Sequence, residues 1–258
     1  MLEFTVDIIL LQKAVAPLAE IADEANIKYS SEGITMMALT TDIIFMGVLK
    51  FRSLDLENFF CDLEGTGGVD LKRLYEILCL LARDPEMDPE GEEYISFYAR
   101  DGDDRIQITF TNRITHTSFP LGIDMTEPEP EPELIHQFEL ETEYNVVAAL
   151  PSWDFRGILR LLFALGDRVS VTITDKQVKF SILNVEIALH KERSECIIWG
   201  TAEDCPVQLG FDIDHFNPFI SASFLTNMVW ILHSDNLLAL HQLNFPVGAA
   251  GNIMLYII

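Results

Sequence analysis

The run Glu127-Pro128-Glu129-Pro130-Glu131-Pro132-Glu133 stands almost at the midpoint of the 258 residues. Alternating proline and glutamate cannot continue a helix, and proline cannot donate a hydrogen bond within a central strand. Repulsion between the glutamates favours an extended, polyproline-like segment. The run therefore predicts a connector between two domains, and we place the three parts at residues 1–121, 122–138 and 139–258.

The two halves on either side of this connector share one order of predicted elements. Each half starts with an apolar strand, Leu2–Asp7 or Asn145–Leu150, and an amphipathic helix follows. The helices expected from the apolar spacing are, in chain order, Ile9–Ala25, Asp70–Arg83, Asp154–Leu165 and Asp214–Leu225. The order β-α-β-β-β-α-β-β-β thus occurs twice, which predicts an α+β protein of two similar domains. Pro17 is expected to bend or split the first helix.

The charge of the chain is strongly acidic. Seventeen Lys and Arg residues stand against forty-one Asp and Glu residues, which gives 17 − 41 = −24. Phosphate binding depends on Lys and Arg, so this balance alone argues against a nucleic-acid partner. The acidic residues run through the whole length, and they predict an acidic, repelling surface.

Cysteine spacing and the N-terminus predict a soluble intracellular protein. The four cysteines, Cys61, Cys79, Cys196 and Cys205, form no CxxC pair. They are expected to be buried free thiols in a reducing compartment. Met1–Phe4 lacks the basic start of a signal peptide, and no apolar run approaches the roughly 18 residues that span a membrane.

Motifs of enzyme active sites are missing from the sequence. Gly65-Thr66-Gly67-Gly68 lacks the Lys-Ser/Thr of a phosphate-binding loop and is expected to be a turn. The six histidines are dispersed and form no HExxH motif. We therefore predict no catalytic residues, no metal site, no cofactor and no enzymatic activity. An acidic α+β enzyme that shares the repeat is an alternative, but it needs a polar constellation that the sequence does not show.

Five short motifs follow one another along the chain in a particular order and spacing. They are Ser30-Ser31-Glu32-Gly33-Ile34, Gly68-Val69-Asp70-Leu71, Leu150-Pro151-Ser152, Val178-Lys179-Phe180-Ser181 and Pro206-Val207-Gln208-Leu209. With these motifs the sequence resembles the eukaryotic and archaeal DNA sliding clamps of the proliferating cell nuclear antigen type. The resemblance covers nearly the whole chain.

The resemblance implies the DNA-clamp fold and a homotrimeric ring, with helices lining a central hole and sheets outside. Double-stranded DNA would pass through the hole in a sequence-independent way. The ring would serve as a processivity factor that tethers DNA polymerase and other replication and repair proteins, with a clamp loader as a further partner. A nuclear location follows, or the DNA-replication compartment if the chain is viral or archaeal. A subunit of a heterotrimeric checkpoint-type clamp is the alternative.

This implied architecture accounts for the acidity, since an acidic exterior avoids non-specific DNA binding while a few basic residues face the hole. The candidates for those residues are Lys13, Lys72, Arg73, Arg156 and Arg160. A solvated helix face is the other explanation of any one of them. The fourth helix carries Asp214, His215 and Ser221 at its polar positions and no Lys or Arg, which predicts weaker contact with the duplex.

The resemblance also implies a hydrophobic pocket for partner peptides. The matching residues are Leu39, Ile44, Leu134, Tyr256 and Ile258. An apolar pocket suits peptide anchors, although ordinary core packing is the better explanation of any single aliphatic residue. Asn236 stands where the family usually has a proline, so the partner peptides are expected to differ from the common motif.

Subunits of the implied ring would meet edge strand to edge strand. One edge is assigned to Ile114–Phe119, with Ile114, His116 and Phe119. The other is assigned to Val185–Lys191, with Val185, Ile187 and Leu189. An unpaired strand edge favours aggregation unless it is covered, and ring closure would cover both edges.

Overall fold

The computed structural model describes residues 1–42, 45–62, 64–82, 94–99, 105–111, 118–130, 143–200, 206–235, 240–248 and 250–257. The chain forms two compact units. The first consists of Met1–Thr41, Gly47–Pro130 and Val247–Ile253, and the second of Asp42–Met46, Glu131–Pro246 and Met254–Ile258. The domain bounds expected from the sequence stay a prediction.

The first half of the chain is mainly β-structure with two α-helices among its described residues. Its elements are β1 (Leu2–Asp7), α1 (Ile8–Ala19), β2 (Glu24–Ser30), β3 (Gly33–Leu39), β4 (Phe45–Arg52), β5 (Glu57–Cys61), β6 (Gly65–Asp70), α2 (Leu71–Leu81), β7 (Tyr94–Ala99), β8 (Arg105–Thr111) and β9 (Ser118–Thr126). A single 3-10 turn, Ser53–Asp55, lies between β4 and β5.

The second half repeats this order. Its elements are β10 (Val146–Pro151), α4 (Ser152–Phe163), β11 (Arg168–Ile173), β12 (Gln177–Ile182), β13 (Val185–His190), β14 (Ile197–Trp199), β15 (Val207–Asp212), α5 (Phe216–Ser223), β16 (Met228–Ser234), β17 (Leu240–Val247) and β18 (Gly251–Ile257). Both halves therefore read β-α-β-β-β-β-β-α-β-β-β, with two more strands before the second helix than the sequence predicted.

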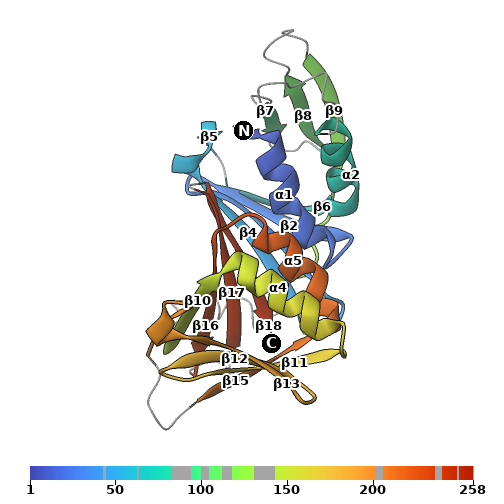
Figure 1. Cartoon of the computed structure of the whole chain (residues 1–258). Coiled ribbons are helices and arrows are strands. Elements are labelled where there is room, and N and C mark those ends of the chain that lie inside the picture. Colours follow the sequence, from blue (N-terminus) through green and yellow to red (C-terminus); the bar gives the residue numbers. More distant parts are fainter. Residues whose placement is uncertain are drawn as a thin grey trace. The chain divides into compact units, whose positions relative to one another are not determined.

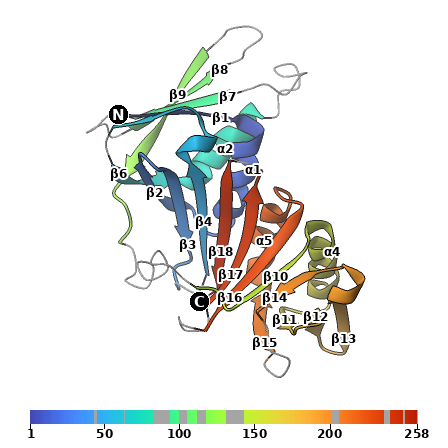
Figure 2. The ribbon, with the colours of Figure 1, turned by 90° about the vertical axis from the view of Figure 1, so that its left-hand side faces the viewer.

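Strand pairing repeats together with the order of elements. β1 pairs with β5 and β7, and β10 pairs in the same way with β14 and β16. β2 pairs with β3 and β6, and β11 pairs with β12 and β15. All of these pairs are antiparallel, and Figure 2 shows β1, β7, β8 and β9 side by side. The predicted duplication and the α+β class are confirmed.

The first helix is shorter than predicted. α1 ends at Ala19 rather than Ala25, because Ala25 and Ile27 are buried as part of β2. The predicted split at Pro17 does not occur, since α1 is one helix with Pro17 buried inside it. Pro17 stands in the last turn, where the missing N–H removes one hydrogen bond close to the natural end of the helix.

The fourth helix begins later than predicted. Ile213–His215 form a 3-10 turn, and α5 starts only at Phe216. The backbone N–H of Asp212 donates to Nδ1 of His215 over 3.1 Å, which fixes the turn. His215 is only 4% exposed, and its ring lies 4.5 Å from the Phe45 ring. The assignment of His215 to a polar surface position is therefore wrong, because aromatic packing and the capping bond hold it inside.

The glycine-rich segment is a strand rather than the predicted turn. Gly65–Asp70 is β6, which pairs with β2 on one side and with the end of β9 on the other. A Cβ added at Gly65 would collide with the Tyr29 ring, and one added at Gly67 would collide with Met125. The side chains of Tyr29 and Met125 thus lie close over this strand, and glycine leaves room for them.

Each unit has its own apolar core beneath a pair of helices. In the first unit α1 packs against α2, and the rings of Phe4 and Phe97 stack 4.5 Å apart. In the second unit α4 packs against α5, as Figure 1 shows. Its centre is the fully buried Phe155, whose ring lies 6.0 Å from Phe219 and 6.3 Å from Phe245. These cores position the outer faces of the helices.

Two further expectations concern cysteines and membrane spans. Cys196 is buried as predicted, but Cys61 and Cys79 are only partly buried, and Cys205 lies outside the described residues. The three described cysteines are free thiols. Within the described ranges, no helix has the length and apolar character to cross a membrane.

Candidate nucleic-acid interface and ring contacts

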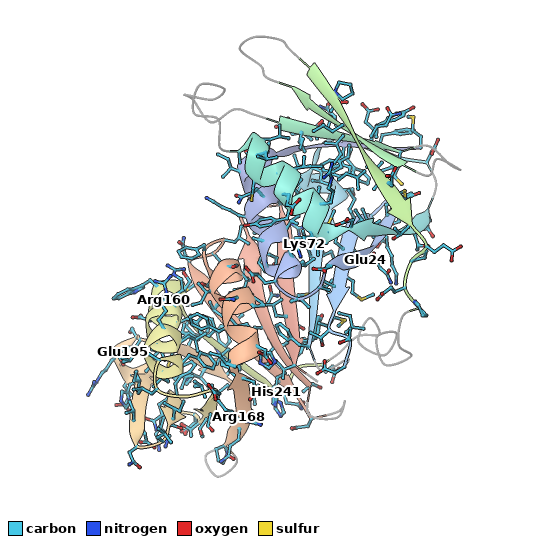
Figure 3. The ribbon with its side chains drawn as sticks, turned by 90° about the vertical axis from the view of Figure 1, so that its right-hand side faces the viewer. Glu24, Lys72, Arg160, Arg168, Glu195 and His241 are labelled. Carbon is cyan, nitrogen blue, oxygen red and sulfur yellow. The ribbon has the colours of Figure 1, made fainter. Side chains whose placement is uncertain are left out.

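Three of the predicted DNA-facing residues lie on α1 and α2 of the first unit. Lys13, Lys72 and Arg73 are all exposed. Lys72 Nζ lies 3.5 Å from Asp23 Oδ1, and this pair is too exposed to hold the lysine firmly (Figure 3). Lys13 and Arg73 form no ion pair with any carboxylate of the described residues. All three cations thus remain available to an external anion.

The other two predicted DNA-facing residues, Arg156 and Arg160, lie one turn apart on α4 and differ in their surroundings. Nη1 of Arg156 donates to the backbone carbonyl of Ser223 over 2.6 Å, and the guanidinium lies 4.5 Å from the centre of the Phe224 ring. Ser223 ends α5, where helix carbonyls lack partners within the helix and carry partial negative charge. Arg156 therefore ties the end of α5 to α4.

The electrostatic surroundings of Arg156 and Arg160 also differ. Burial, and next the neighbouring charge of Arg160, lowers the pKa of the Arg156 guanidinium. Arg160 is exposed and forms no ion pair with a described carboxylate (Figure 3). Of the two, Arg160 is the residue that the geometry leaves open to a phosphate.

Of the two assigned ring-contact strands, β13 lies at the edge of its sheet, whereas β9 lies between β6 and β8 in the other sheet. β13, which contains Val185, Ile187 and Leu189, pairs with β12 and is the last strand of its four-stranded sheet; the role of these residues in a subunit contact stays a prediction. Val185 is 37% exposed, whereas Leu189 is buried. β9 pairs with β8 along its length, but with β6 only through Met125 and Thr126 among the described residues. Phe119 lies on the open stretch, and Ile114 and His116 lie outside the described residues.

Two of the five partner-pocket residues are described. Leu39 is partly buried at the end of β3 in the first unit. Tyr256 in β18 of the second unit is 7% exposed, and its hydroxyl lies 3.5 Å from Met254 Sδ. Ile44, Leu134 and Ile258 lie outside the described residues, so the pocket stays a prediction.

The connector is anchored at its start. Residues 127–130 are exposed, yet the Asn26 side chain donates to the Glu129 carbonyl and accepts from the Glu129 N–H, each over 2.8 Å. An amide that satisfies both backbone groups of one residue fixes that residue to β2.

A histidine pair escaped the sequence analysis, because its members are eight residues apart. His233 and His241 face each other across β16 and β17, with their Nδ1 atoms 3.1 Å apart. Nε2 of His233 lies 2.8 Å from Asp235 Oδ1. A neutral His233 that donates to Asp235 accepts the Nδ1–H of His241. Burial, and next the nearby His233, lowers the pKa of His241 to about 4.

The described residues contain no cluster of three or more metal-ligating side chains.

The sequence analysis also missed two exposed aromatic residues beside the α4 arginines. Trp153 is 70% exposed and Phe224 is 57% exposed. The spacing of Trp153 and Arg160, seven residues apart on one helix, could have placed them on one face.

The duplicated topology, with helix pairs over antiparallel sheets and open edges in both halves, is that of a DNA sliding clamp. Residues 1–127 match the family model of the proliferating cell nuclear antigen N-terminal domain, and residues 140–257 match that of its C-terminal domain. The chain is also similar to the proliferating cell nuclear antigen of Chaetomium thermophilum. The identity is 23% over 257 residues, which cover 96% of this chain and 93% of the relative. The chain belongs to the proliferating cell nuclear antigen family.

Replacing the two α4 arginines separately tests their division of roles. Arg156→Ala removes a charged donor from the end of α5, and we expect the free energy of unfolding to fall by about 1.5–3 kcal/mol. Arg160→Ala, the matched control, should change it by less than about 0.5 kcal/mol. Urea unfolding of both variants measures the difference. Equal losses would contradict the assignment.

The pairing of His233 with the partly buried His241 should make the free energy of unfolding depend on pH. Because the folded pKa of His241 lies below its ordinary value of 6.5, its contribution to stability is present above pH 6.5 and is lost as the pH falls toward 4. Partial exposure limits the expected loss to about 1–2 kcal/mol. Urea unfolding at pH 7.5 and pH 4.5 should show that the native chain loses this much more than His241→Gln. Carboxylate effects are common to both proteins, so parallel losses would contradict the prediction.

Proposed function

We propose that this chain forms a closed homotrimeric ring around double-stranded DNA and acts as a processivity factor. In this role it tethers DNA polymerase and other replication and repair proteins, and a clamp loader opens the ring. The protein works as a scaffold without catalysis or a cofactor. The observation that supports the proposal is a pair of strand stretches that pair on one side only among the described residues, Ser118–Asp124 of β9 in the first half and β13 in the second.

Two different open edges on one chain favour a head-to-tail contact between copies. Such a contact is heterologous, and it produces a ring when the rotation between subunits closes. An exposed edge left uncovered is prone to non-specific strand pairing. Joining β9 of one copy to β13 of the next would cover these two edges in every copy, and a family of ring-forming clamps supports closure over an open filament.

DNA contact is proposed to come from Lys13, Lys72, Arg73 and Arg160. These cations are exposed on helices of a chain whose net charge is −24. Few contacts of this kind give weak binding that salt weakens further and that carries no sequence information. Weak contact suits sliding, because the closed ring rather than affinity would keep the protein on DNA.

Partner proteins are proposed to bind by short peptides at the predicted pocket formed by Leu39, Ile44, Leu134, Tyr256 and Ile258. The partly buried Leu39 and the nearly buried Tyr256 are the described members of this group. A nuclear site of action, at replicating and repaired DNA, follows from this role and from the similarity to a fungal relative.

A subunit of a heterotrimeric checkpoint-type clamp is the second candidate. It is favoured by α5, which contributes no Lys or Arg; Asn217 of this helix and Phe224 directly after it are exposed instead. In a mixed ring, the basic residues missing from this helix could be supplied by the other subunits.

The molar mass of the purified chain distinguishes the homotrimer from the subunit of a mixed ring. Light scattering over a concentration series should give the mass of three chains, because ring closure covers both edges in each copy. A chain that stays monomeric at micromolar concentration would contradict the homotrimer and favour the mixed ring.

Charge reversal tests the DNA-facing helices. The double variant Lys13→Glu with Arg160→Glu should lower polymerase processivity, with an unchanged molar mass. The slope of log affinity against log salt should fall by about 0.9 for each phosphate that the variant no longer neutralises. The matched control is Lys176→Glu with Arg193→Glu, which carries the same charge change in the second unit, on the bend before β12 and on the 3-10 turn Lys191–Arg193. If both double variants reduce processivity equally, the helices have no special role.

A further inference from the structure

An exposed aromatic surface lies on the same face of α4 as Arg160. Residues 153 and 160 are seven apart, which places them about 20° apart around the helix and about 10 Å apart along its axis. The Phe224 ring adjoins this face from the end of α5, with the Arg156 guanidinium 4.5 Å and the Arg160 guanidinium 6.0 Å from its centre. We call Trp153, Arg156, Arg160 and Phe224 the α4 aromatic surface.

Gly157 lies between the two ends of this surface. It occupies the middle of α4, is exposed, and an added Cβ would meet no atom within 4 Å. Packing within the chain therefore does not require glycine here, although glycine in a helix interior lowers stability. A glycine of this kind lets a bound molecule approach the helix backbone closely.

Resting on the proposed function, we propose that the α4 aromatic surface binds unpaired nucleotides of single-stranded DNA. One base would stack on the indole of Trp153 and another on the Phe224 ring, while Arg160 would bind a phosphate. The surface would add a preference for exposed bases, such as those next to a primer end, to the sequence-independent duplex contact of the ring.

The chemistry of the surface favours unpaired bases over an intact duplex. Stacking needs an accessible base face, and paired bases hide their faces within the helix stack. Phosphate contact alone requires only cations, so exposed aromatic rings add little to duplex binding. Aromatic rings combined with arginine are the arrangement that binds single strands without sequence preference.

Charge complementarity favours nucleic acid over a neutral peptide. Arg160 forms no ion pair with a described carboxylate, and Lys and Arg are scarce in this acidic chain. The acidic neighbour Asp154 is partly buried, and its pKa is raised by burial and next by the repulsion of Glu195.

Binding of a labelled oligo(dT) to the full chain tests this proposal by fluorescence anisotropy. Stacking on an aromatic ring is typically worth about 5- to 150-fold in affinity per base. Trp153→Ala should weaken binding by this factor, and Trp153→Phe should weaken it less. Trp199→Ala is the matched control, since Trp199 is 54% exposed on β14 of the same unit, and it should bind like the native chain.

A second variant tests whether a loss of oligo(dT) binding comes from misfolding rather than from the lost contact. Gly157→Gln replaces glycine by a better helix former without changing charge, so thermal stability should rise while oligo(dT) affinity falls at least fivefold. Unchanged affinity in both Trp153→Ala and Gly157→Gln would overturn the proposal and leave the surface as a protein-docking face. The binding assay needs neither loading nor a ring. If the proposal alone fails, processivity and trimer mass remain intact, whereas a failed clamp has neither.

Discussion

Backbone N–H and C=O groups along two strand edges, all of β13 and the unpaired part of β9, are the constraint on which the proposed assembly depends. Strands inside the sheets satisfy their N–H and C=O groups by pairing within the chain, but β13 and most of β9 pair on one side only among the described residues. The duplication makes this possible, since each half supplies one such edge. A contact between unlike edges extends antiparallel pairing from one copy to the next, and closure covers both edges in every copy.

The charge of the molecule acts together with this constraint. A chain with a net charge of −24 repels DNA over most of its surface, so only the cations on the helices can approach phosphates. The structure narrows this set further, because Arg156 is held by the carbonyl of Ser223. A ring held on DNA by closure tolerates such weak contact. The exposed Trp153 and Phe224 give the same helix face a second kind of interaction, with bases rather than phosphates.

Local pattern and motif order predicted much of the fold. The central Pro/Glu run and the apolar spacing of Ile158, Leu159 and Leu162 correctly indicated a duplicated α+β chain. Short strands were missed where their sequences lack alternation: β6 is rich in glycine because Tyr29 and Met125 cover it, and β14 has only three residues.

The candidate site was less predictable, because contacts distant in sequence decide it. His215 looked polar but is buried against Phe45, 170 residues earlier in the chain. His233 and His241 become neighbours only through pairing of β16 with β17. Arg156 and Arg160 are equivalent by helical spacing, and only the position of the end of α5 separates them. The pocket residues Leu39 and Tyr256 stay predictions.

The central claim, that the chain forms a ring around DNA, is tested most directly by whether blocked DNA ends retain the protein. The chain would be threaded onto a linear duplex tied to a bead at one end, and the other end would then be blocked or left open. A wash in about 1 M salt, where the Debye length is about 3 Å, removes protein held only by charge. An encircling ring predicts retention on the blocked duplex and rapid loss from the open one. Equal loss from both would contradict encirclement, as would equal retention.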